Sequence, residues 1–314
     1  MLRAVVLPIL ALATVSRAFQ VNYTTTTGNL YKERKDVTSA VFADNVDLIE
    51  NDAFWDCSHL TGHIDLSSTN VRVIGNESFS YTKITRVSFP SSLEKINSFA
   101  FDACYYLTGH INLSSTTVRA IGEAAFRSTR ITRVSFPSSL ELIEKEAFEA
   151  CDRLTGHIDL SSTKIKIIED AAFSDSGITG IFFPSSLEGI GASVFYGCYF
   201  FQAVDMPGVT SVGANAFYAT NIISLRVEST LTLDDNHFKH ISVNFSGPHF
   251  PSCNRSHGIG ESFCNCAIGN VSCFPALPAP APAPSPPNPE AKSTAETTRP
   301  ALYAFALFFI CVNF

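Results

Sequence analysis

The amino-acid sequence predicts an α/β-type repeat solenoid, in which similar turns of the chain stack along one axis. Cys57, Cys104, Cys151 and Cys198 lie 47 residues apart. The string Leu-Thr-Gly-His-Ile-(Asp/Asn)-Leu-Ser-Ser-Thr occurs at 60–69, 107–116 and 154–163, and Phe-Pro-Ser-Ser-Leu-Glu at 89–94, 136–141 and 183–188. A fixed period of this length is typical of repeat architectures, whose units bury their apolar faces against their neighbours.

Each 47-residue unit divides into two similar halves, because phenylalanine recurs every 21–25 residues. We therefore expect about nine turns between residues 37 and 240, stacked at the inter-strand spacing of about 4.8 Å. The recurring phenylalanines are Phe54, Phe79, Phe101, Phe126, Phe148, Phe173, Phe195, Phe217 and Phe238.

One half-unit shows which elements to expect. Ile84, Val87 and Phe89 alternate inward, and Pro90 ends the strand. These Ile-x-x-Val-x-Phe-Pro segments predict a parallel sheet on one face of the solenoid. Turns and irregular or short helical segments, such as the Glu- and Lys-rich residues 141–146, are predicted on the other face.

The template Ile-x-x-Ile-x-Phe-Pro-x-x-Leu-x-x-Ile-x-x-x-Ala-Phe-x-x-Cys resembles the BspA-like (Treponema-type) leucine-rich repeat. The resemblance covers residues 37–240, with Ala-Phe at 53–54, 100–101, 125–126, 147–148, 172–173 and 216–217. Departures are Ser-Phe at 78–79, Val-Phe at 194–195 and the loss of the cysteine on alternate turns. The resemblance implies a surface-exposed or secreted leucine-rich-repeat stack that serves as a binding scaffold. Several members of the family are implicated in adhesion to host or matrix proteins, and the family is not associated with catalysis; the resemblance does not identify a ligand.

Composition excludes several classes of protein. The chain is 46% hydrophobic and 16% charged, so most of its 314 residues can form a packed core. A net charge of -7 without a basic run argues against nucleic acid as a partner. No Gly-rich phosphate loop or metalloprotease helix is present, and we expect neither a cofactor nor a metal.

The amino-terminal segment resembles a secretory signal peptide. Arg3 supplies the positive charge, residues 4–15 the apolar stretch, and Ser16-Arg17-Ala18 a cleavage site. We therefore expect residues 1–18 to be removed and residues 19–36 to cap the start of the solenoid.

The carboxyl-terminal segment predicts a membrane tether. Residues 275–300 hold nine of the 16 prolines and are expected to form an extended stalk. The hydrophobic residues 301–314 resemble a signal for glycosylphosphatidylinositol (GPI) attachment, at Ser293 or Ala291. A short membrane helix and an inert tail remain alternatives.

Two groups of cysteines have different expected roles. The four that repeat lie two turns apart, about 10 Å, which is too far for a disulfide or a shared metal, so they predict a buried ladder. A second group within the expected carboxyl-terminal cap, residues 241–274, predicts two disulfides, with a zinc knuckle as the alternative. This second group is Cys253, Cys264, Cys266 and Cys273.

Outward-facing strand positions form two neighbouring rows that predict a ligand-binding face. The first row contains His63, Arg86, His110, Arg133 and His157; the second contains Asp65, Asn112 and Asp159. Such a face suits an extracellular protein or glycan, bound more strongly below about pH 6.5, where histidine becomes charged. Alternatively, these residues are copied with the repeat and simply solvated.

The same residues do not predict an active site. His63, Asp65 and Ser67 alternate along one strand, so neighbours on the same face are expected about 6.5–7 Å apart, beyond hydrogen-bond reach. The trio also recurs in three units, as duplication predicts. We therefore expect a protein that is not an enzyme.

Together these features predict a GPI-anchored protein of the outer leaflet of the plasma membrane that mediates adhesion or recognition. A structural glycoprotein of a cell coat or wall and a soluble secreted binder are the alternatives. Six Asn-x-Ser/Thr sites are compatible with each of them. They lie at Asn22, Asn76, Asn112, Asn244, Asn254 and Asn270.

Overall fold

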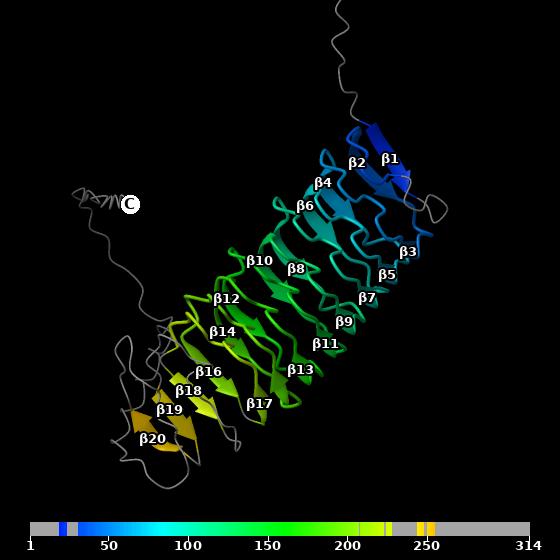
Figure 1. The fold of residues 1–314 in the computed structure, drawn as a ribbon. Helices are drawn as coiled ribbons and strands as arrows, with labels where there is room; N and C mark the ends of the chain where they lie inside the picture. Colours follow the sequence, from blue (N-terminus) through cyan, green and yellow to red (C-terminus); the bar gives the residue numbers. More distant parts are fainter. Residues whose placement is uncertain are drawn as a thin grey trace, which may run out of the picture. The chain divides into compact units, whose positions relative to one another are not determined.

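The computed structural model describes residues 19–23, 31–206, 208–222, 224–227, 244–247 and 250–254. The chain divides into two compact units, residues 1–275 and 276–314, and every described residue belongs to the first. The described residues form a β-solenoid whose successive turns lie side by side (Figure 1). The predicted repeat solenoid is therefore confirmed, and its regular elements are all strands.

Strands of four to six residues form one side of the solenoid, and we call their outward surface the strand face. β4 pairs with β6 and β8 with β10, while β12, β14, β16 and β18 continue in one parallel sheet. These strands are β2 (Val37–Phe42), β4 (Thr61–Asp65), β6 (Lys83–Ser88), β8 (Thr108–Asn112), β10 (Arg130–Ser135), β12 (Gly156–Asp159), β14 (Ile178–Phe182), β16 (Ala203–Met206) and β18 (Ser224–Val227). The predicted parallel sheet is present, although its hydrogen-bonded ladder is interrupted.

The ends of this side carry additional strands. β1 (Phe19–Tyr23) pairs in parallel with β2 at the amino-terminal end. At the other end β19 (Asn244–Gly247) pairs in parallel with β18 and antiparallel with β20 (Phe250–Asn254).

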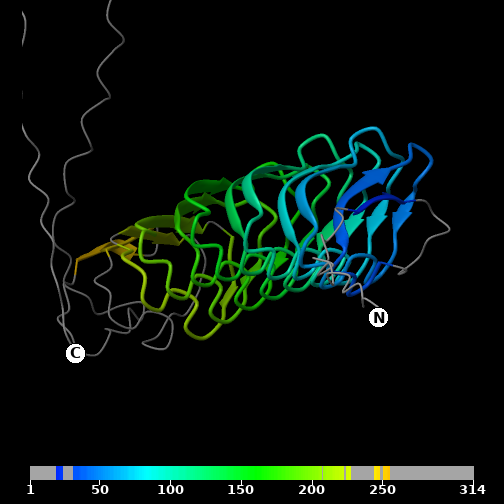
Figure 2. The same cartoon turned by 90° about the horizontal axis from the view of Figure 1, so that it is seen from above.

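Two-residue strands form a second parallel sheet on the opposite side, which the sequence did not predict. This eight-stranded sheet defines eight turns, which Figure 2 shows stacked in register. The ninth expected turn extends into residues outside those described. The eight strands are β3 (Leu48–Ile49), β5 (Val73–Ile74), β7 (Lys95–Ile96), β9 (Ala120–Ile121), β11 (Leu142–Ile143), β13 (Ile167–Ile168), β15 (Gly189–Ile190) and β17 (Ser211–Val212).

The return from the two-residue strands to the strand face is made of turns, where short helical segments were an expected alternative. No helix occurs among the described residues. Glu146 and Ala150 flank Phe148 with φ angles of 58° and 54°, in the left-handed region. The amide of Phe148 donates to the carbonyl oxygen of Ala172 on the next turn at 2.8 Å. The backbone thus bonds between turns of the solenoid, and an α-helix cannot form.

A column of stacked phenylalanine rings fills the interior. Consecutive rings lie nearly parallel, with centroids 5.2–6.1 Å apart. The members of the column are fully buried, and the inward Ile and Leu side chains of both sheets surround them. Burial of an aromatic side chain of this size is strongly stabilising, and each turn needs its neighbours to achieve it. The seven contacts join Phe54, Phe79, Phe101, Phe126, Phe148, Phe173, Phe195 and Phe217.

Tyrosines continue this column at the amino-terminal end. Tyr31 stacks on Phe54 at 5.5 Å, with an interplanar angle of 9°. Tyr23 of β1 is fully buried and contacts the rings of Phe42 and Phe54. Residues 19–23 and 31–36 therefore cover the first turn with aromatic side chains of the kind found inside the solenoid.

Candidate functional site

Strand pairing brings the predicted binding residues together in rows across the strand face. His63 lies opposite Arg86, and His110 lies opposite Arg133. Asn112 lies opposite Ser135 in the same ladder as the second pair. Two neighbouring rows therefore run along the solenoid axis from β4 to β10.

The two rows continue onto later turns with altered chemistry. His157 lies opposite Gly180, and Asp159 lies opposite Phe182. The basic residue of the first row is thus absent from β14, and an aromatic ring replaces the serine of the second row. Along the first row, the basic and imidazole side chains from β4 to β12 are therefore followed by Gly180 on β14.

A bulge turns additional side chains outward. The register shifts between Gly62 and His63 on β4 and skips Thr85 on β6. Gly62 has a φ of 81°, which a residue with a side chain adopts only with strain. Because of the bulge, Thr85 and Arg86 are both exposed although they are consecutive. The repeat on β8 and β10 has the same bulge, at Gly109 and Thr132.

Each histidine of the row contacts the next strand. His63 Nε2 lies 2.8 Å from Ser88 Oγ, and His110 Nε2 lies 2.9 Å from Ser135 Oγ. His157 instead stacks on Phe182, with ring centroids 5.3 Å apart. These partners were not predicted, because Ser88 and Ser135 belong to the second row and lie diagonally across from the histidines of the first row.

The second row has a structural role that the sequence analysis also missed. Asp65 Oδ1 accepts hydrogen bonds from the backbone amide of Ser67 at 3.0 Å and from its hydroxyl at 2.7 Å. The expected separation of about 6.5–7 Å is therefore wrong for this pair, because β4 ends at Asp65 and the chain turns. These bonds lower the pKa of Asp65 below its usual value.

The same turn recurs in the other two copies. Asn112 Oδ1 accepts from both groups of Ser114, and Asp159 Oδ1 from both groups of Ser161, with the pKa of Asp159 lowered by the same bonds. Since asparagine serves as well as aspartate, the turn requires an acceptor oxygen and not a charge. The (Asp/Asn)-x-Ser spacing is the signal that identifies such a turn.

The His–Ser pairs raise the question of nucleophilic catalysis. A serine nucleophile needs a base that is itself oriented by a third group. Within the described residues no carboxylate bonds to His63 or His110, and both imidazoles are exposed. The contact with serine therefore orients each imidazole on the strand face, and no third group among the described residues orients it as a catalytic base.

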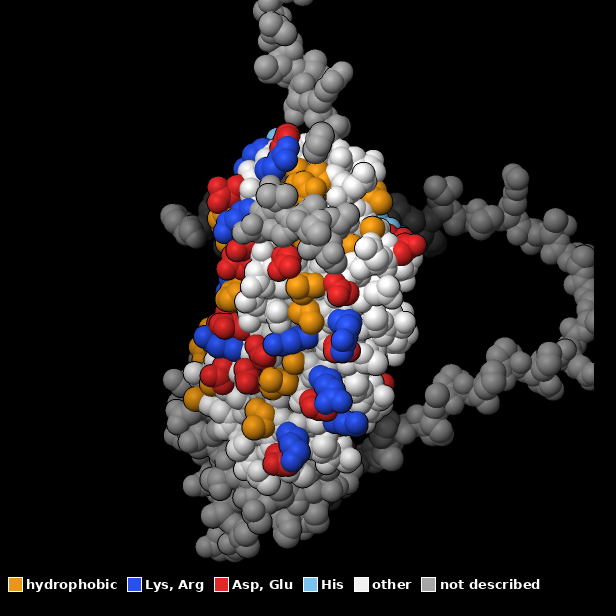
Figure 3. Space-filling model, turned by 90° about the vertical axis from the view of Figure 1, so that its right-hand side faces the viewer, with side chains coloured by type: hydrophobic (Ala, Val, Ile, Leu, Met, Phe, Trp, Pro, Cys, Tyr) orange, Lys and Arg blue, Asp and Glu red, His pale blue; other side chains and the backbone are white. Residues whose placement is uncertain are grey.

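Most of the described Lys and Arg side chains away from the strand face have acidic partners, whereas those on the strand face have none. Nine described Lys and Arg side chains form ion pairs, including Arg72 with Glu94, Arg119 with Glu141 and Lys166 with Glu188. On the face over the two-residue strands, basic and acidic side chains lie next to each other (Figure 3). On the strand face the described cations have no ion pair. These are Lys83, Arg86, Arg130 and Arg133.

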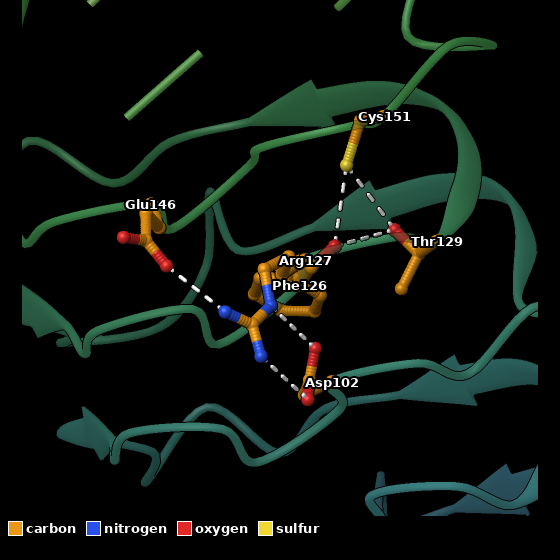
Figure 4. Close-up of polar contacts among 6 residues, drawn as sticks. All are labelled: Asp102, Phe126, Arg127, Thr129, Glu146 and Cys151. Atoms are coloured by element: carbon orange, nitrogen blue, oxygen red, sulfur yellow. Dashed lines mark hydrogen bonds and ion pairs between the residues drawn. The ribbon is translucent and has the colours of Figure 1, made fainter. Parts of the chain in front are cut away.

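Arg127 is an ion-paired arginine, in contrast to the arginines of the strand face. Its Nε and Nη2 donate to Asp102 on the preceding turn at 2.9 and 3.1 Å, and its Nη1 donates to Glu146 on the following turn at 2.9 Å (Figure 4). Both acids are partly or largely buried. Arg127 therefore links three turns of the solenoid.

The four repeat cysteines are buried and free. Burial raises the pKa of Cys57 to about 11 and that of Cys104, Cys151 and Cys198 to about 12. Thiols with such high pKa values are poor nucleophiles and poor metal ligands at neutral pH. Among the described residues, no cluster of three His, Cys, Asp or Glu suits a metal ion.

Several predicted features lie outside the described residues: the signal peptide 1–18, the stalk 275–300, the hydrophobic segment 301–314, Ser293, Ala291, Asn270, and Cys264, Cys266 and Cys273. Cys253, Asn244 and Asn254 lie in β19 and β20, which are described as strands only. Among the residues that the structure describes, no helix is long and apolar enough to span a bilayer.

Comparison with known proteins identifies the family. The model of the BspA type Leucine rich repeat region, in six copies, matches residues 24–155 and 119–244, well over half of the chain. No curated protein sequence matches.

Several solved structures are similar to this chain at low sequence identity. A leucine rich cell surface protein from Faecalibacterium prausnitzii is 21% identical, with 71% of this chain and 76% of that chain covered and a TM-score of 0.44. A leucine-rich repeat protein from Eubacterium ventriosum is 17% identical; the match covers 67% of this chain and 66% of that chain, with a TM-score of 0.43. The pneumococcal vaccine antigen PcpA is 18% identical; the match covers 68% of this chain and 70% of that chain, with a TM-score of 0.38. From the match to the family model, we conclude that this chain belongs to the BspA-type leucine-rich repeat family.

Proposed function

We propose that this protein is an extracellular adhesion or recognition protein that binds a macromolecular partner through its strand face. The observation that carries the proposal is the exposed row formed by His63, Arg86, His110, Arg133 and His157. Membership of a family of repeat scaffolds supports binding as the activity.

The electrostatics of the strand face favours binding over a purely structural role. Arg72 and Arg119, on the other face, form surface ion pairs within the chain, whereas Arg86 and Arg133 have none among the described residues. Unneutralised charge on a surface attracts partners of the opposite sign and accelerates their association. The open sheet surface also suits a large partner more than a small molecule, because small molecules bind in concave pockets.

Replacement of the five row residues by serine tests the proposal. All five are exposed, so the variant should keep the stability of the native chain while losing attachment to cells or extracellular matrix. The matched control replaces Arg72, Arg119 and Lys166, which are exposed on the opposite side. Undiminished attachment of the five-residue variant would show that the strand face is not the binding surface.

We further propose that the protein is GPI-anchored on the outer leaflet of the plasma membrane. The hydrophobic segment 301–314 behind a polar stretch supports this tether. Treatment of intact cells with a phosphatidylinositol-specific phospholipase C should release the protein into the medium. Retention on the cell would instead favour a short membrane helix, and spontaneous secretion a soluble binder.

A structural glycoprotein of a cell coat is the second candidate, favoured by the exposure of sequon asparagines. Asn22, Asn76 and Asn112 are all exposed. If glycans are the working surface, enzymatic deglycosylation should abolish the phenotype while the serine substitutions have no effect. A glycan on Asn112 would stand between Ser88 and Ser135 on the strand face and would count against the first proposal.

A further inference from the structure

We propose that strands β6, β8 and β10 form a binding site for a linear sulfated polysaccharide. The proposal rests on the proposed function, since it assigns a ligand class to the same strand face. We call the site the cationic patch and define it as Lys83, Arg86, His110, Arg130 and Arg133.

The register of the strands places these residues on one surface. Arg86 and Arg133 occupy the row that contains His110, directly opposite Arg133. Lys83 and Arg130 start β6 and β10, opposite Thr61 and Thr108 respectively. β6, β8 and β10 are neighbours along the solenoid (Figure 1).

The positive charge of the patch is not neutralised by the chain itself. Six described Lys and Arg side chains lack an ion pair, and four of the six belong to the patch. The protein as a whole carries a net charge of -7, so an accumulation of free cations at one place is a local feature. Such a feature marks a site for an anionic partner.

Neutral hydrogen-bonding groups surround the cations. Ser88, Asn112 and Ser135 fill the neighbouring row between β6 and β10. The nearest acidic residues of that row are Asp65 on β4 and Asp159 on β12. Repulsion by these two carboxylates limits a bound anion to the three strands between them.

Repetition of the charges favours a polymer with repeating anions. The Lys83 and Arg86 pair recurs as Arg130 and Arg133 two turns later, at a separation of about 10 Å. A linear polysaccharide presents the same group at each repeat and can therefore satisfy identical sites in succession. Guanidinium groups suit the oxygens of sulfate, which they bind through two parallel hydrogen bonds. A folded acidic protein has no comparable reason to match a repeated pair.

The test measures binding of the purified full chain to heparin, used as a sulfated polysaccharide probe, to fully desulfated heparin, and to polyglutamate. The critical variant replaces Arg86 and Arg133 by serine. The matched control replaces Arg72 and Arg119 by serine, which removes the same charge from two exposed residues that are also 47 residues apart.

We expect the Arg86 and Arg133 variant to lose heparin affinity about tenfold or more, and the control variant less than about twofold. Affinity of the native protein should fall steeply with salt, because binding releases counterions from the polyanion. Desulfated heparin and polyglutamate should bind much more weakly.

Three results would overturn the assignment: equal losses in both double variants, undiminished binding of desulfated heparin, or polyglutamate binding as tight as heparin, which would indicate an acidic protein partner. Attachment to cells, measured on the same variants, separates this proposal from the proposed function. Loss of attachment without heparin binding overturns only the ligand class. Heparin binding with undisturbed attachment overturns the role of the strand face in adhesion.

Discussion

The thiol of Cys151 and the hydroxyl of Thr129 lie 3.3 Å apart, and both donate to the carbonyl oxygen of Phe126. The sulfur lies 3.2 Å and the hydroxyl 2.8 Å from this acceptor (Figure 4). The two groups come from consecutive turns, so the cysteine of one turn and the threonine of the preceding turn share one buried carbonyl. The threonine thus bonds to a carbonyl oxygen of its own turn, whereas the cysteine bonds to a carbonyl oxygen of the preceding turn.

Replacement of Cys151 by alanine should lower the free energy of unfolding by about 1–3 kcal/mol, because it removes a buried hydrogen bond and leaves a cavity. Replacement by serine should cost less, since a donor remains. Urea denaturation of both variants measures the difference. An equal loss of unfolding free energy in both variants would show that the thiol stabilises the protein through packing alone and not through its hydrogen bond to Phe126.

The raised thiol pKa values predict a loss of stability at alkaline pH. Cys104, Cys151 and Cys198 have a pKa of about 12 in the folded chain, against 9.0 for an ordinary cysteine. Below pH 9 the thiols are neutral in both states; between about pH 9 and 12 only the unfolded chain loses the protons. The free energy of unfolding should then fall by about 1.4 kcal/mol per pH unit for each such cysteine.

Urea denaturation at several pH values above 9 measures this slope. Other groups titrate in the same range, so the informative quantity is the difference from the Cys151→Ala variant. Its slope should be smaller by the contribution of one cysteine. An unchanged slope would contradict the raised pKa of Cys151.

Replacement of Arg127 by alanine should destabilise the protein by about 2–4 kcal/mol, because it leaves the buried carboxylate of Asp102 without a partner. Lysine at this position should restore part of the loss, as it keeps the charge without the forked geometry. The control is Arg119→Ala, which breaks an exposed contact of 3.9 Å and should cost less than about 0.5 kcal/mol. Similar melting temperatures for the two alanine variants would refute the bridging role.

The turn after β4 predicts that Asp65→Asn is tolerated whereas Asp65→Ala costs about 1 kcal/mol, since only alanine loses both bonds to Ser67. The lowered pKa of Asp65 contributes stability above the ordinary carboxyl pKa, which is lost as the pH falls through the folded value. Asp65→Asn should therefore unfold less steeply in acid than the native chain.

Denaturation between pH 2 and 7 tests this behaviour. A bacterial host is required, because the asparagine variant contains a new Asn-x-Ser site. Identical acid profiles for the native and asparagine chains would show that the carboxylate charge adds nothing to the turn.

Two glycines should differ sharply in their tolerance of alanine. A Cβ on Gly75 would lie 2.6 Å from backbone atoms of Asn51 and Glu50 on the preceding turn, so Gly75→Ala should prevent normal stacking. A Cβ on Gly62 would meet nothing within 4 Å, so Gly62→Ala should cost only the strain of a left-handed backbone, about 1–2 kcal/mol. Circular dichroism and thermal unfolding distinguish these outcomes; equal stability of the two variants would be the contrary result.

The strand register was predictable because the phenylalanine that recurs every 21–25 residues aligns each turn with the next. His63 and Arg86 are therefore neighbours in the sequence pattern as well as in the sheet. The contact between His63 and Ser88 was not predictable from this alignment, because Ser88 lies opposite Asp65 and the imidazole reaches it diagonally.

The second sheet and its adjoining turns were not predictable from local preference. Residues 144–150 are rich in Glu, Lys and Ala, which favour a helix in isolation. Their backbone instead bonds to the next turn, and Glu146 and Ala150 adopt left-handed conformations. Hydrogen bonds between turns thus outweigh local helix propensity, and the sequence of a single half-repeat does not reveal these bonds.

The tyrosine at the start of the phenylalanine column has a consequence for how such a chain changes in length. Tyr31 stacks on Phe54, the ring of the first turn, and the later rings of the column stack on the rings of adjacent turns. Duplication or deletion of one 47-residue unit would therefore rejoin equivalent surfaces and leave both termini of the stack intact. Each such event would add or remove two turns and, where the unit contains β6 or β10, one pair of cations without an ion pair. The number of binding positions would then change in discrete steps while the architecture is preserved.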